Sequence, residues 1–83
     1  LMMDLILTRL RHIDGIPHKA LQDLGYKINL SLLQKHLQHH MLEISDNGDL
    51  KLGQKGWILV DALILEVIEA TEKNTLHNQV MNI

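Results

Sequence analysis

A change in hydrophobic period after Met41 constrains the fold more than any other feature of the sequence. Apolar and polar residues alternate on both sides of Asn47-Gly48, which is the pattern of two β-strands. The alternating residues are Leu42, Glu43, Ile44 and Ser45 before the turn and Asp49, Leu50, Lys51 and Leu52 after it. Asn-Gly favours the type I′ turn, which joins two antiparallel strands through a two-residue loop. The sequence therefore predicts a β-hairpin.

Helical periodicity precedes the hairpin. Residues 1–12 carry apolar side chains at i, i+3, i+4 and i+7, the stripe of an amphipathic helix: Met3, Ile6, Leu7 and Leu10. A short second helix is expected from Pro17, which suits a first helical position, to about Leu24. Gly25 can end that helix in a left-handed conformation.

A third helix is expected after the connector "YKIN". Ser31 and Gln34 offer a capping box at its start, and Asn29 is the competing cap. Leucines at positions 30, 33 and 37 line one face of this helix, which fades near His40.

The longest apolar stripe follows the hairpin and predicts a C-terminal helix. Its members are Trp57, Val60, Leu63, Ile64, Val67 and Ile68, with acidic residues at 61, 66 and 69 on the other side. We expect this helix to be the most buried.

The order helix, helix, helix, hairpin, helix predicts an α+β fold of winged-helix-like architecture: three helices, a β-hairpin wing and a C-terminal helix. The extended step at Gly15-Ile16 is a candidate third strand beside the hairpin. We expect one domain over residues 1–71, followed by a polar, flexible tail over residues 72–83. Because Leu1 already lies inside a periodic pattern and has no cap before it, we expect the domain to belong to a longer protein.

Composition narrows the chemistry of the chain. The 83 residues include no Phe or Cys, one Trp and one Tyr, so the core must be aliphatic. Without Cys the chain can form no disulfide and hold no cysteine-ligated cluster, which fits a reducing compartment. Its apolar runs fall far short of the roughly 18 residues of a membrane span. We therefore expect a soluble, cytoplasmic protein without a membrane span.

A DNA-binding domain of a transcription regulator is the alternative interpretation of this architecture. The formal net charge is −2, whereas nucleic-acid binders usually gather many cations on one face. Lys35 is the one permanent cation on the predicted reading helix, although Gln34 and Gln38 could contact bases. Asp46 and Asp49 flank the turn and would repel phosphates. The charges thus disfavour nucleic acid as a partner.

Histidines supply the candidate metal ligands. His36, His39 and His40 stand at i, i+3 and i+4, so a helix would place them on one face that could bind a divalent metal. Metal sites normally need a third or fourth ligand, and residues that hydrogen-bond to the ligands and orient them. The sequence specifies neither nearby, so we expect surface imidazoles and no metal. His12 and His18 flank the junction of the first two helices, where they could approach the hairpin or a partner. Their spacing matches no catalytic pattern.

Three stretches resemble the C-terminal domain of the oxygen-independent coproporphyrinogen III oxidase family, including its heme-chaperone-like relatives. The stretches are "DLILTRLRHIDGI", "LGYKINLSLLQKHLQHHML" and "LKLGQKGWILVDALI". The first resembles the family's acidic residue, aliphatic helix, Leu-Arg pair and Gly-Ile step. The third resembles a Leu-Thr-Pro-Lys-Gly segment followed by an aliphatic helix. The resemblance covers residues 1 to about 70 and departs from the family at Leu24, His40-Met41 and Gly53-Gln54.

The resemblance implies a noncatalytic accessory domain of a protein of heme biosynthesis. Its catalytic radical S-adenosylmethionine barrel, with an iron-sulfur cluster on Cys-x-x-x-Cys-x-x-Cys, would lie elsewhere in the parent chain. That parent would be an oxidoreductase acting on coproporphyrinogen III, or a heme chaperone. No catalytic residue or cofactor falls on the present residues. The domain would pack on the barrel and help enclose the tetrapyrrole. Arg11 and His12 are the candidate contacts to a propionate or to the barrel. A surface ion pair is the other interpretation of Arg11.

Overall fold

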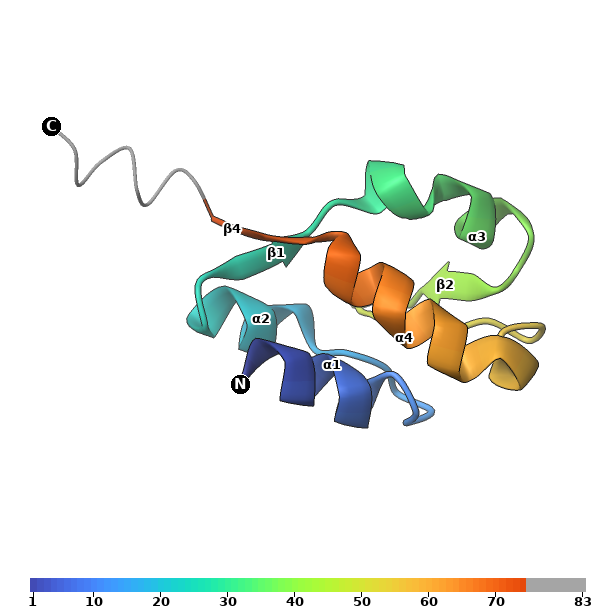
Figure 1. Cartoon of the computed structure of the whole chain (residues 1–83), viewed down its shortest axis with the longest axis horizontal. Helices are drawn as coiled ribbons and strands as arrows, with labels where there is room; N and C mark the ends of the chain where they lie inside the picture. Colours follow the sequence, from blue (N-terminus) through green and yellow to red (C-terminus); the bar gives the residue numbers. More distant parts are fainter. Residues whose placement is uncertain (75–83) are drawn as a thin grey trace, which may run out of the picture.

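The computed structural model describes residues 1–74 as an α+β fold of helices and two small antiparallel sheets (Figure 1). The helices are α1 (Met2–Arg9), α2 (His18–Asp23), α3 (Gln34–Gln38) and α4 (Val60–Glu69), with the 3-10 turns η1 (Leu30–Leu33) and η2 (Trp57–Leu59). The strands are β1 (Tyr26–Ile28), β2 (Leu42–Ile44), β3 (Leu50–Leu52) and β4 (Thr71–Lys73). The predicted class and the order of helices, hairpin and final helix are confirmed.

The hairpin has the predicted strands and a different turn. β2 and β3 pair with Leu42 opposite Leu52 and Ile44 opposite Leu50. The Ser45 N–H donates to the Asp49 carbonyl at 2.9 Å, so the loop holds three residues, and Gly48 alone in it has a positive φ, of 86°. A type I turn followed by a left-handed glycine is the usual three-residue loop, and the predicted type I′ turn is wrong.

The extended step before α2 joins the hairpin, as predicted. Ile16 pairs with Leu50, and its N–H donates to the Leu50 carbonyl at 2.8 Å. Gly15 has a φ of 78°, and a Cβ there would collide with the backbone of Leu50. Glycine is therefore the residue that lets the chain approach β3 this closely.

The segment expected to be a connector forms a second sheet with the chain that follows α4. Tyr26 lies opposite Lys73 and Ile28 opposite Thr71. The sheet extends past the predicted boundary at residue 71, so Glu72 and Lys73 belong to the folded part. The remainder of the predicted tail, residues 75–83, lies outside the described residues. Periodicity could not predict this pairing, because each strand has three residues and finds its partner far along the chain.

The core is aliphatic, as the composition requires. Its buried members are Ile6, Leu10, Ile16, Leu21, Leu33, Leu42, Leu50, Leu52, Leu63, Ile64, Val67 and Ala70. α4 contributes more of them than any other helix, as expected, although Trp57 at its approach is half exposed.

The stripe predicted on α1 is rotated in the structure. Ile6 and Leu10 are fully buried, but Met3 and Leu7 are 57% and 46% exposed. Met2 and Leu5 pack against the core instead. The sequence offers apolar residues on both sides of Ile6, and the packing of α1 on α4 selects one side.

The third helix starts differently from the expected capping box. The Asn29 side chain accepts a hydrogen bond from the Ser31 N–H at 3.1 Å, so Asn29 caps the 3-10 turn η1. α3 then continues only to Gln38. The competing cap identified in the sequence is the one the structure uses.

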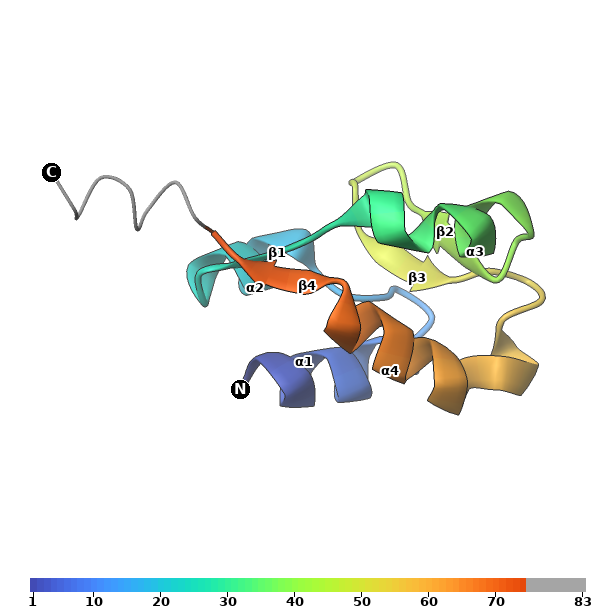
Figure 2. The same cartoon turned by 45° about the horizontal axis from the view of Figure 1, so that its top comes forward.

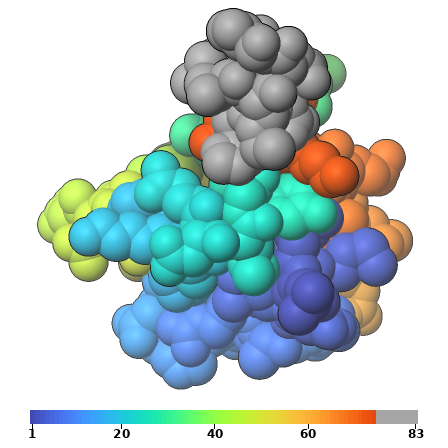
Figure 3. Space-filling view, turned by 90° about the vertical axis from the view of Figure 1, so that its left-hand side faces the viewer, coloured from blue at the N-terminus to red at the C-terminus, as the bar shows by residue number. Residues whose placement is uncertain are grey.

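The elements are arranged around the core so that α1 and α4 lie side by side, while α3 and the hairpin lie on the other side of α4 (Figures 1 and 2). The hairpin, in yellow-green, projects beside the chain that enters α2, in light blue (Figure 3). Across residues 1–74, no helix has the length and apolar character needed to cross a membrane.

Candidate functional site

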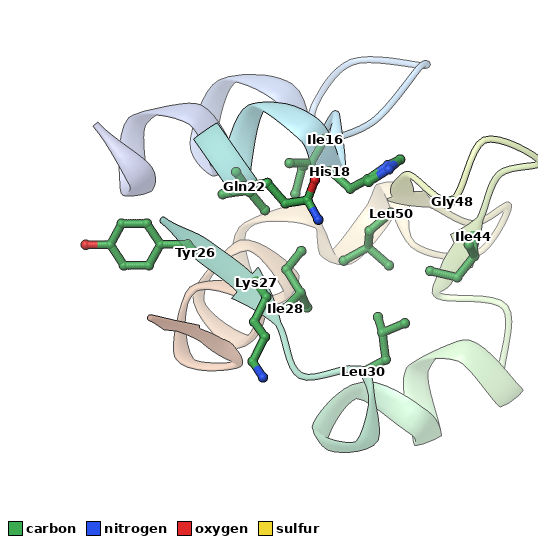
Figure 4. A pocket seen from close by; sticks show the side chains of 11 residues that line it. Ile16, His18, Gln22, Tyr26, Lys27, Ile28, Leu30, Ile44, Gly48 and Leu50 are labelled. Atoms are coloured by element: carbon green, nitrogen blue, oxygen red, sulfur yellow. The ribbon is translucent and has the colours of Figure 1, made fainter. Parts of the chain in front are cut away.

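A hollow of about 250 Å³ lies between β1, α2, η1 and the hairpin (Figure 4). Aliphatic side chains form most of its wall: Ile16, Leu21, Ile28, Leu30, Ile44 and Leu50. Polar side chains of His18, Gln22, Tyr26 and Lys27 surround them. The hollow lies between the hairpin and the third helical segment, which are the elements a winged helix uses to contact DNA. An apolar surface at this position is unsuited to phosphates.

Strand alternation explains why the hollow is apolar. Leu42 and Ile44 point to the same face of β2, but Leu42 is buried and Ile44 is 41% exposed. Ile44 therefore continues the apolar face of β2 from the buried core to the protein surface. Leu30, at the start of η1, is 42% exposed and faces the same hollow.

The volume of the hollow limits what it can take. Pockets for drug-sized ligands usually measure about 300–1,000 Å³. A hollow of about 250 Å³ accommodates one or two side chains, and a whole tetrapyrrole needs more room.

An Asp-His pair joins the hairpin to the start of α2 beside this hollow. Asp49 Oδ1 accepts hydrogen bonds from the His18 backbone N–H at 3.0 Å and from His18 Nδ1 at 2.6 Å. The Asp49 N–H donates to Ser45 Oγ at 3.2 Å. The bond from the His18 backbone N–H, followed by that from its imidazole, lowers the pKa of the Asp49 carboxyl. The prediction that His18 could approach the hairpin is confirmed. Asp49 was not predicted as its partner, because the two residues are 31 positions apart in the sequence.

Arg11 and His12 lie just beyond α1, and neither lines the hollow. Arg11 Nη2 donates to Asp61 Oδ1 at 2.5 Å, and the two side chains are 50% and 85% exposed. His12 Nδ1 accepts from the Asp14 N–H at 3.2 Å. Arg11 therefore forms a surface ion pair, which was one of the two interpretations of this residue. The side chains of Arg11 and His12 both remain accessible to solvent.

The three histidines at the end of the third helix are not brought together as a metal site. α3 ends at Gln38, and His40 has a φ of 62°, so the helical repeat does not continue through residue 40. His36 Nε2 lies 2.7 Å from Glu66 Oε2 on α4. In the part of the chain that the structure describes, no group of three or more His, Cys, Asp or Glu side chains is placed to hold a metal.

Exposed apolar side chains also lie on α1, on α4 and on the turn before α4. Met3 and Leu7 lie on the exposed side of α1, and Leu65 and Ile58 are 62% and 91% exposed on α4 and the turn before it. The two helices run antiparallel (Figure 1), and the Arg11–Asp61 ion pair links their ends. Asp61 and Leu65 lie four residues apart on α4, so helical spacing places Leu65 one turn from the ion pair, whereas Arg11 lies two residues past the end of α1. We call these four apolar residues, with the ion pair, the α1–α4 face.

Comparison of the chain with models of known families, with curated proteins and with solved structures gives no match.

Proposed function

We propose that this chain is a noncatalytic accessory domain of a protein resembling oxygen-independent coproporphyrinogen III oxidase or its heme-chaperone relatives. In this proposal the α1–α4 face packs on the radical S-adenosylmethionine barrel of the same parent chain. The barrel carries the S-adenosylmethionine and the iron-sulfur cluster, and the accessory domain helps enclose the tetrapyrrole.

The observation that carries the proposal is the α1–α4 face itself. Scattered exposed apolar side chains are normal, but several on adjacent helices form the kind of patch that marks a contact with another protein surface. Ile58, Leu65 and Met3 are each more than half exposed. The three sequence stretches that resemble the family supply the identity of the proposed partner.

Arg11 and His12 lie at the edge of the α1–α4 face and are the proposed contacts to the barrel or to a propionate. An exposed ion pair contributes only about 0–1 kcal/mol, so the Arg11 guanidinium can exchange Asp61 for another carboxylate at small cost. A bidentate contact to a propionate would be stronger because both guanidinium nitrogens donate.

The docking proposal is tested on the parent protein. The coding sequence upstream should encode Cys-x-x-x-Cys-x-x-Cys, and amide hydrogen exchange of the longer protein should show α1 and α4 more protected than in the 83-residue chain. Leu65→Asp should remove that protection, whereas the matched variant Ile44→Asp, in the hollow, should keep it. Absence of the three-cysteine motif, or equal exchange of α1 and α4 in both proteins, would contradict the proposal.

Tetrapyrrole contact is tested separately by adding coproporphyrin or hemin to the 83-residue chain and following amide resonances. We expect shifts around Arg11 and His12 that are reduced in Arg11→Gln. Shifts confined to other residues would remove the direct contact at Arg11 and leave docking of the α1–α4 face to be judged by hydrogen exchange.

A further inference from the structure

One edge of β1 carries backbone groups that β4 does not use. The Asn29 N–H donates to the Ala70 carbonyl and the Asn74 N–H to the Gly25 carbonyl. Because hydrogen-bonded pairs alternate along an antiparallel ladder, Lys27 also faces β4, and the N–H and C=O groups of Tyr26 and Ile28 point the other way. Within residues 1–74 these outward groups have no hydrogen-bond partner.

The hollow runs along this same edge. All three residues of β1 line it, although successive side chains of a strand point to opposite faces, and no residue of β4 lines it. Figure 4 shows β1 on one side of the hollow and Leu50 and Gly48 of the hairpin on the other. A free strand edge and an apolar hollow therefore adjoin each other.

Electrostatics select the kind of occupant. Lys27 lines the hollow, and within residues 1–74 no carboxylate is among the lining residues. Glu72 lies opposite Lys27 on β4, where its Oε2 accepts from Asn29 Nδ2 at 3.2 Å, and Asp49 is hydrogen-bonded to His18. An occupant with acidic side chains beside its apolar residue would complement Lys27. The volume suits one aliphatic or aromatic side chain.

We propose that the β1 edge binds an extended peptide segment by strand addition. The segment pairs its backbone with Tyr26 and Ile28, places one large apolar side chain in the hollow and presents acidic side chains to Lys27. In such complexes main-chain hydrogen bonds give affinity, and pockets for alternate side chains give specificity. This surface is separate from the α1–α4 face, so the inference does not depend on the proposed function.

The probe is a set of blocked peptides, Thr-Glu-Thr-X-Thr-Glu-Thr, in which X is Leu, Ile, Val, Met or Phe, with X as Ala for comparison. Binding to the 83-residue chain is followed through the amide resonances of residues 26 to 28, and the Ala peptide should bind about tenfold or more weakly than the best of the others. Successive backbone amides of a strand point to opposite sides, so only every second amide of the bound peptide faces β1. N-methylation of the amides that face β1 should abolish binding of the best peptide, and N-methylation of the others should be tolerated.

Matched protein variants locate the site. Ile44→Asp places a charge in the hollow at a position that is already 41% exposed, and it should weaken binding about tenfold or more. Ile58→Asp makes the same chemical change at a position 91% exposed on the other surface, and binding should be unchanged. Amide dispersion of both variants checks that they are folded.

Three results would each overturn strand addition. The first is no shift at residues 26 to 28 with any peptide at millimolar concentration. The second is an equal response to both N-methylation patterns. The third is a shift of the amide resonances of residues 26 to 28 on addition of a short DNA duplex but not of the peptides, because that result would assign the edge to nucleic acid.

Discussion

Replacing Asp49 with alanine should destabilise the fold, because this carboxylate fastens the hairpin to the start of α2. Its Oδ1 accepts two hydrogen bonds, from the backbone N–H and from Nδ1 of His18. The alanine variant leaves both donors without their acceptor. Asp49→Asn is the milder change, because an amide oxygen still accepts from the backbone N–H and only the charge is lost.

The size of the effect follows from exposure. Hydrogen bonds to charged groups contribute about 1.5–3 kcal/mol when well buried. The side chains of Asp49 and His18 are 21% and 44% exposed, so solvent screens the pair and the lower part of that range applies. We expect Asp49→Ala to cost about 1.5–2 kcal/mol, which lowers the melting temperature of a domain of this size by roughly 6–16 °C. Asp49→Asn should cost about half as much.

The same contacts set a pH dependence of stability. The pKa of Asp49 is lower in the folded chain than in the unfolded chain. In the unfolded chain an Asp carboxyl has its ordinary pKa of about 3.9. A depressed carboxyl pKa gives stability that is fully present above the unfolded value and is lost as the pH falls through the folded value. The difference in free energy of unfolding between the natural chain and Asp49→Asn should therefore be constant at neutral pH. It should become smaller as the pH falls below about 4.

Urea denaturation between pH 3 and 7, followed by circular dichroism, measures these differences. Asp61→Asn is the control, since Asp61 is 85% exposed and should change stability little. Two results would contradict a stabilising role of the Asp49 carboxylate. One is an equal free energy of unfolding for Asp49→Asn and the natural chain at pH 7, and the other is a difference between them that stays the same down to pH 3.

Further variants test the packing. Gly15→Ala should cost at least about 2 kcal/mol in urea denaturation, because the added Cβ meets the Leu50 backbone at a positive φ; a neutral result would refute the close approach. Leu63→Ala, at a buried site, should cost about 2–5 kcal/mol, whereas Leu65→Ala, at an exposed site, should stay within about 0.5 kcal/mol; equal effects would contradict the orientation of α4. Asn29→Ala should cost about 1 kcal/mol through loss of its cap, and unchanged thermal stability would mean that the cap contributes little.

Features that depend on near neighbours in the chain could be predicted from the sequence. Alternation around Asn47-Gly48 predicted the strands of the hairpin, and the stripe through Leu63 and Val67 predicted the most buried helix. These predictions succeed because a strand repeats every two residues and a helix every 3.6, so the pattern of burial is written locally. The predicted turn type was wrong, because the closing pair between Ser45 and Asp49 gives a three-residue loop, and alternation does not set the loop length.

Long-range packing selects among local arrangements that the sequence leaves equivalent. Met2 and Met3 are the same residue type next to each other, and only the contact of α1 with α4 decides which is turned to the core. The β1–β4 sheet and the Asp49–His18 pair join residues 31 or more positions apart. Such pairings gain their free energy only after the intervening chain has folded and brought the partners together. For the same reason the β1 edge and its adjoining hollow exist only in the assembled fold.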